Sequence, residues 1–132
     1  MGYGLPAAVA AAATAPEREV MCFAGDGCFM MTCQELATAV QHELNLTVVV
    51  VNNNRYGTIR AHQEREYPGR VSGTALSNPD FTAFARAFGA GAWTVSTFDE
   101  FAMALTEARA RGGVKLIEIA QDESLLAPGI RL

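Results

Sequence analysis

Two polar turns in the sequence carry oxygen-bearing side chains that suit a divalent cation. Gly25-Asp26-Gly27 follows the apolar run 19–24, and Asn52-Asn53-Asn54 follows the apolar run 46–51. If the two runs are neighbouring strands of one parallel sheet, both turns lie at the same edge and Asp26 faces Asn53. One carboxylate and one amide oxygen are a weak site alone. They suit a magnesium-like ion that takes its other ligands from a diphosphate, water and a backbone carbonyl.

The residues beside Asp26 also favour an anionic ligand. Gly25 and Gly27 let the backbone come close to a phosphate, because they have no side chain in the way. The helix expected after the turn points its N-terminus at the same place, which favours negative charge. The Gly-x-Gly-x-x-Gly turn and the Walker-type lysine of nucleotide-binding modules are both missing from the chain. A general α/β phosphate-binding module therefore remains only an alternative.

The elements that must position these turns alternate between strand and helix. This order predicts an α/β fold, a three-layer parallel sheet flanked by helices, with right-handed crossovers. Thr32 and Glu35 predict a capping box for the second helix. Residues 55–78 are polar and predict a long functional or mobile loop, and the tail from Gln121 is weakly determined. The expected strands are 19–24, 46–51, 92–95 and 114–120, and the expected helices are 6–14, 32–43, 80–88 and 98–111.

Composition excludes several classes of protein. The chain has 132 residues, which fits one domain, and a net charge of −4 without a basic cluster. Nucleic acid and anionic membrane are therefore not expected as partners. The longest strongly apolar run, 44–51, is too short to span a bilayer. Cys22, Cys28 and Cys33 form no Cys-x-x-Cys pair and read as free thiols in a reducing cytoplasm.

Four segments in register resemble one family, the thiamine diphosphate-dependent enzymes. Asn53 follows Asp26 by 27 residues (53 − 26), a spacing typical of the thiamine diphosphate motif. The likeness covers about residues 1–60 and is greatest to the acetolactate synthase, pyruvate oxidase and benzoylformate decarboxylase group. The chain then resembles the C-terminal, diphosphate-binding domain of such an enzyme. The four segments are 1–8, 25–27, 34–39 and 53–57.

The resemblance assigns roles position by position. It implies a Mg²⁺ ion bound by the side chains of Asp26 and Asn53 and by the backbone carbonyl of Arg55. It implies that the backbone N–H groups of Gly27 and Cys28 hold diphosphate oxygens. Met1 stands where the family places a bulky apolar residue that wedges the two cofactor rings together. The residues expected to contact the cofactor are Met1, Gly25, Asp26, Gly27, Cys28, Asn53, Arg55, Tyr56 and Gly57.

The resemblance also implies what the chain lacks. The family needs a pyrimidine-binding domain whose glutamate activates the cofactor, and nothing in residues 1–132 resembles it. We also expect the start of the diphosphate domain to lie upstream of Met1. We therefore expect a truncated domain without a catalytic acid or base, inactive alone, whose open apolar face favours a homo-oligomer or a partner. The substrate class would be a 2-oxo acid, processed by decarboxylation or carboligation. A non-catalytic remnant or assembly subunit is the other alternative.

Overall fold

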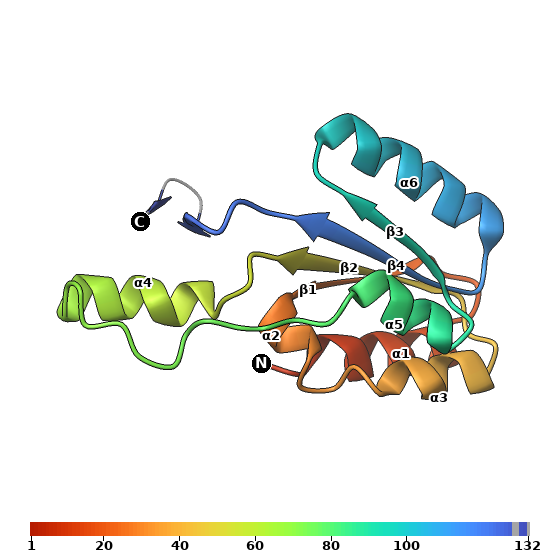
Figure 1. The fold of residues 1–132 in the computed structure, drawn as a ribbon. Helices are drawn as coiled ribbons and strands as arrows, with labels where there is room; N and C mark the ends of the chain where they lie inside the picture. Colours follow the sequence, from red (N-terminus) through yellow and green to blue (C-terminus); the bar gives the residue numbers. More distant parts are fainter. Residues whose placement is uncertain (128–129, 132) are drawn as a thin grey trace.

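A parallel sheet of four strands in the order β1-β2-β4-β3 forms the centre of the molecule (Figure 1). The computed structural model describes residues 1–127 and 130–131. β1 pairs with β2, and Gly25 lies opposite Val51, so the two polar turns leave the same edge of the sheet as predicted. The strands are β1 (Val20–Gly25), β2 (Leu46–Asn52), β3 (Gly91–Val95) and β4 (Val114–Ala120).

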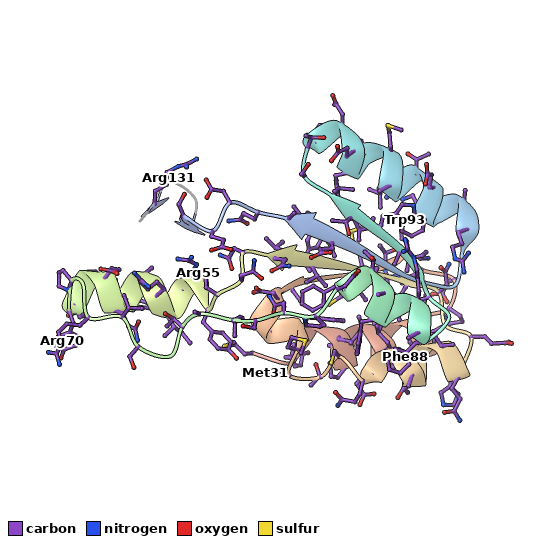
Figure 2. All side chains as sticks on the ribbon, viewed as in Figure 1. Met31, Arg55, Arg70, Phe88, Trp93 and Arg131 are labelled. Atoms are coloured by element: carbon purple, nitrogen blue, oxygen red, sulfur yellow. The ribbon has the colours of Figure 1, made fainter. Side chains whose placement is uncertain are left out.

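Helices cover both faces of the sheet and confirm the predicted α/β class. Three longer helices and one short helix pack on one face, and α6 packs on the other, above β3 and β4 (Figure 1). β2 is buried from Leu46 to Val50 because it lies between two strands and beneath helices. Trp93 packs with Ile117 beneath α6 (Figure 2). The longer helices of the first face are α1 (Gly4–Thr14), α3 (Glu35–Gln41) and α5 (Phe81–Ala87), and α6 is Phe98–Arg111.

Several predicted boundaries shift by a few residues in the structure, and two of these shifts concern the helices that follow the first polar turn. The short helix α2 (Asp26–Phe29) begins at Asp26 itself, so the polar turn is the first turn of a helix. α3 ends at Gln41 and not at Glu43, because Glu43 adopts a left-handed φ of 52°.

The segment 55–78 is not a continuous loop, and that prediction was wrong. Residues Gly57–Glu66 form the helix α4, which extends away from the sheet (Figure 1). None of its residues is buried, so it has no apolar face that a sequence pattern could detect. An Arg60–Glu64 ion pair of 2.6 Å links successive turns of the helix. The tail forms two short antiparallel strands, β5 (Leu125–Ala127) and β6 (Ile130–Arg131). No helix among the described residues is long and apolar enough to cross a membrane.

The predicted capping box at Thr32 is also wrong. No side chain caps α3, and the Thr32 hydroxyl donates to the carbonyl of Gly2 at 3.0 Å. The capping box of this chain lies at α6, where Thr97 Oγ1 accepts the N–H of Glu100 at 3.2 Å. The Ser96 N–H and hydroxyl donate to Glu100 and hold the pKa of its carboxyl below the usual range.

Replacing Thr97 by alanine is expected to lower the free energy of unfolding by about 1 kcal/mol, because the N–H of Glu100 loses its acceptor. Urea denaturation monitored by circular dichroism measures the change. Thr106→Ala provides the contrast in the same helix, because the exposed Thr106 hydroxyl donates only to the Ala102 carbonyl and alanine favours the helix interior. Equal unfolding free energies for wild-type protein and the Thr97 variant would contradict the assignment of the box.

Candidate functional site

A pocket of about 360 Å³ opens where β1 and β2 end. Of the nine residues expected to contact a cofactor, all but Asn53 line it. Asn53 is not on this wall; it follows β2 directly in the chain and is 9% exposed. Thr58 and Ile59, at the start of α4, complete the wall and were not predicted. The predicted residues on the wall are Met1, Gly25, Asp26, Gly27, Cys28, Arg55, Tyr56 and Gly57.

Asp26 places a buried carboxylate at this edge of the sheet. The residue is only 2% exposed. Its Oδ1 accepts the N–H of Gly27 at 2.8 Å, and its Oδ2 accepts Nδ2 of Asn78 at 2.7 Å. Within the described part of the chain, no lysine or arginine forms an ion pair with it. A buried carboxylate without a cationic side chain suits a bound metal ion, which would supply the missing positive charge.

Asn78 is a member of the site that the sequence did not reveal. Its Nδ2 lies within hydrogen-bonding distance of three oxygens. The distances are 2.7 Å to Asp26 Oδ2, 3.0 Å to Asn52 Oδ1 and 3.3 Å to Asn54 Oδ1. In the sequence Asn78 precedes a proline and reads as the start of a helix. Only the approach of the segment before α5 to the end of β1 reveals its contact with Asp26.

The turn after β2 leaves the backbone carbonyl of Arg55 outside the hydrogen bonds to the segment around Ala75. Asn54 has a left-handed φ of 54°, which asparagine tolerates. Arg55 then pairs with Ala75, but the two hydrogen bonds of this bridge use the groups on either side of Arg55. The bridge therefore leaves the Arg55 carbonyl available to a ligand. The Arg55 guanidinium forms an ion pair with Glu123 at 3.1 Å, near the point where β2 leads into α4 (Figure 2).

Gly27 is required by space at this site. A Cβ on Gly27 would lie 2.3 Å from Cε1 of Tyr56, so the tyrosine ring rests directly on the glycine backbone. A Cβ on Gly25 would meet nothing within 4 Å, so the backbone there is open to the pocket. The N–H of Gly27, one of the two expected phosphate donors, donates to Asp26 Oδ1. The other, on Cys28, lies in the first turn of α2, where the helix offers no acceptor.

Side chains of the α2 region hold the N-terminal segment against the pocket. The N–H of Gly2 donates to Sγ of Cys28 at 3.1 Å. The Gly2 carbonyl accepts the Thr32 hydroxyl, which explains why Thr32 caps no helix. Met1 lines the pocket and is 65% exposed, so its side chain projects from this anchored segment. Nearby in β1, burial raises the pKa of the Cys22 thiol, and Cys28 raises it to a lesser extent.

The fold and the pocket define a Rossmann-like α/β domain with a pocket at the carboxyl edge of its parallel sheet, where open α/β sheets bind their ligands. Residues 1–119 match the family model described as "Thiamine pyrophosphate enzyme, C-terminal TPP binding domain". The chain therefore belongs to this family of thiamine diphosphate-binding domains, as the sequence motifs predicted.

Relatives in the family include enzymes of two kinds. Over 124 residues, the chain is 40% identical to the acetolactate synthase isozyme 2 large subunit of Escherichia coli (strain K12). This match covers 93% of the chain and 23% of that protein. It superposes with a TM-score of 0.85 and 33% identity on benzoylformate decarboxylase from Polynucleobacter necessarius, covering 94% of this chain and 24% of that one. A thiamine diphosphate-dependent 4-hydroxybenzoylformate decarboxylase from Rhodococcus jostii RHA1 gives 0.87 and 31%, with the same coverage. The chain thus spans about a quarter of the length of these relatives.

Proposed function

We propose that the chain anchors thiamine diphosphate through Mg²⁺, as the diphosphate-binding domain of an acetolactate synthase-like enzyme that acts on 2-oxo acids by decarboxylation or carboligation. The observation that carries this proposal is the pocket at the ends of β1 and β2. It gathers the buried carboxylate of Asp26, the open backbone at Gly25 and the turn around Arg55.

The donor atoms fit a hard divalent cation. Asp26 would contribute a carboxylate oxygen, Asn53 an amide oxygen and Arg55 its backbone carbonyl. Oxygen ligands of this kind suit Mg²⁺, which keeps water and substrate phosphates as its other ligands. The cation would also neutralise Asp26, whose burial is costly while it carries an unpaired charge.

The residues of this chain would bind and orient the cofactor. When bound, thiamine diphosphate supplies a carbon nucleophile for addition to the carbonyl of a 2-oxo acid. Asp26, Asn53 and Arg55 would fix the diphosphate end through the metal. The N–H of Cys28 would donate to a diphosphate oxygen, and Met1 would support the cofactor from below. None of these residues acts as an acid or base, so the proposal assigns proton transfer at the aminopyrimidine to a glutamate of a separate pyrimidine-binding domain or subunit.

Exposed apolar side chains on the N-terminal segment and on the turn that contacts it support a partner at this edge. Tyr3 is 79% exposed, Met30 40% and Met31 49%, and Met31 Cβ lies 3.2 Å from where a Cβ on Gly2 would stand. A cluster of large exposed apolar side chains marks a site of interaction with another protein more often than a surface left in water. This edge is therefore our candidate for the contact with the pyrimidine-binding partner in a homo-oligomer.

Isothermal titration calorimetry tests the anchoring function. The purified protein is titrated with thiamine diphosphate in Mg²⁺ and again in EDTA, and binding is expected only with the metal. Thiamine without the diphosphate is the matched control ligand and is expected to give no metal-dependent heat. Both titrations are repeated with a candidate pyrimidine-binding partner. Cofactor binding that is equally tight in EDTA, or no binding at millimolar cofactor with or without the partner, would contradict the proposal.

A further inference from the structure

Glu118 is a buried carboxylate on β4 that the proposed function does not use. It is 9% exposed, and within the described part of the chain it forms no ion pair. Its Oε1 accepts Nδ2 of Asn52 at 2.7 Å, and its Oε2 accepts the hydroxyl of Thr94 at 3.0 Å. Both partners are on the neighbouring strands β2 and β3. A carboxylate buried between two strands is costly, and the cost suggests a use beyond packing.

The hydrogen bond from Asn52 to Glu118 determines which way the Asn52 amide points. If the amide were rotated by half a turn, its oxygen would face the carboxylate of Glu118, and the two acceptors would repel each other. Glu118 therefore holds Oδ1 of Asn52 toward the site. There this oxygen accepts Nδ2 of Asn78 at 3.0 Å and the N–H of Asn54 at 3.1 Å.

Asn78 passes this orientation on to Asp26. With Asn52 Oδ1 fixed as an acceptor, Asn78 must present its NH₂ group to the site. The same group donates to Asp26 Oδ2 at 2.7 Å. Three hydrogen bonds thus join Glu118 to Asp26 through Asn52 and Asn78, across β4, β2, the segment before α5 and the start of α2.

We propose that Glu118 is a positioning residue for the metal site, which fixes the carboxylate of Asp26 through Asn52 and Asn78. This inference rests on the proposed function, because it assigns Asp26 to a metal. In metalloproteins, residues that hydrogen-bond to a metal-binding side chain hold that side chain in its binding geometry. Their loss weakens metal binding about 10–100-fold. Glu118 is not one of the residues that line the pocket, so it would act through Asn52 and Asn78.

Two substitutions separate the geometry of Glu118 from its charge. Glu118→Leu removes both acceptors and frees the Asn52 amide to rotate. Glu118→Gln keeps an oxygen for Asn52 and turns an NH₂ group toward the Thr94 hydroxyl, which can accept it. With saturating thiamine diphosphate, Mn²⁺ affinity measured by electron paramagnetic resonance is expected to fall about 10–100-fold in the leucine variant. The glutamine variant is expected to stay close to wild type.

Ile117→Ala is the matched control for a loss of stability alone. Ile117 is the preceding residue on β4, is fully buried, and packs under α6 on the opposite face of the sheet. Its truncation is expected to lower the melting temperature and leave the Mn²⁺ affinity of the folded protein unchanged. If Glu118→Leu and Ile117→Ala weaken Mn²⁺ binding equally, Glu118 acts only through the fold and the inference is wrong.

A readout without cofactor separates this inference from the proposed function. In nuclear magnetic resonance spectra, the side-chain NH₂ protons of Asn78 are expected to exchange slowly in the wild type and in Glu118→Gln, and quickly in Glu118→Leu. Wild-type protein that binds no Mn²⁺ with the cofactor, with or without a pyrimidine-binding partner, would overturn the proposed function together with the inference. Normal Mn²⁺ binding and slow Asn78 exchange in Glu118→Leu would overturn the inference alone.

Discussion

Replacing Asp26 by asparagine is expected to weaken Mg²⁺-dependent binding of thiamine diphosphate by at least about 100-fold, more than the loss of a residue behind a metal ligand costs. The substitution keeps the size of the side chain and removes its charge. A neutral amide gives the cation one weaker oxygen donor, and the buried site has no other carboxylate on the pocket wall to replace it. Calorimetric titration with the cofactor in Mg²⁺ measures the change.

Asp80→Asn is the matched control for this charge change. Asp80 caps α5 and accepts the N–H of Ala83 at 2.8 Å, and it is not part of the pocket wall. Asparagine caps a helix about as well as aspartate, so both stability and cofactor binding are expected to stay near wild type. Wild-type affinity in the Asp26 variant would refute its role as a metal ligand. An equal loss in both variants would point to net charge instead.

Replacing Phe29 by alanine is expected to lower the free energy of unfolding by about 3–5 kcal/mol. That is a large share of the roughly 5–15 kcal/mol that stabilises a domain. Phe29 is 1% exposed, and its ring meets Phe81 edge-on at a centroid distance of 5.5 Å and Phe84 at 6.3 Å. Because Phe29 ends the four-residue helix that starts with Asp26, the cavity is also expected to weaken cofactor binding. Urea denaturation and calorimetry measure the two effects.

Phe98→Ala makes the same change at the surface. Phe98 begins α6 and is 82% exposed, so its truncation is expected to change the unfolding free energy by less than about 0.5 kcal/mol. A loss of under about 1 kcal/mol in the Phe29 variant would mean that α2 can repack around the missing ring. The site would then not depend on this aromatic cluster.

The sheet and its order of elements could be predicted because the strands carry their own signal. The run from Leu46 to Val51 is apolar throughout and β-branched, and the structure buries it on both sides. The site prediction requires β1 and β2 to be neighbours, and their parallel register shows that they are. Helix ends were less certain, because Thr32 and Glu35 have the spacing of a capping box without its geometry, while the true box at Thr97 was not recognised.

The helix α4 escaped prediction for a physical reason. Periodicity reveals a helix only when one of its faces is buried, and no residue from Gly57 to Glu66 is. Contacts within the helix and its surroundings stabilise it instead, among them the Arg60–Glu64 pair. Prediction from the sequence therefore described this segment by its composition and mistook a polar helix for a loop.

For the site, the sequence predicted the residues next to the motif but not those that come from elsewhere. Arg55 and Cys28 lie beside the recognised turns and do reach the pocket. Asn78 follows Asp26 by 52 residues and Glu118 follows Asn52 by 66, so no local pattern connects either pair. Chemical type offered one signal, since Glu118 is the one carboxylate in the stretch 114–120, which is apolar apart from Glu118 and Lys115. A carboxylate in a buried strand indicates a hydrogen-bonding role, because its burial is otherwise costly.

The strand order has a consequence for the way the chain acquires its shape. β4 is the last of the four strands in the sequence, yet it lies between β2 and β3. During synthesis β3 has no neighbour to pair with until residues 114–120 emerge, so half of the sheet must wait for the final strand. Parallel sheets closed by such distant segments fold slowly and expose unpaired strand edges while they do so. β4 is thus also the strand that brings Glu118 to Asn52, and the polar network can form only after β4 has paired with β2.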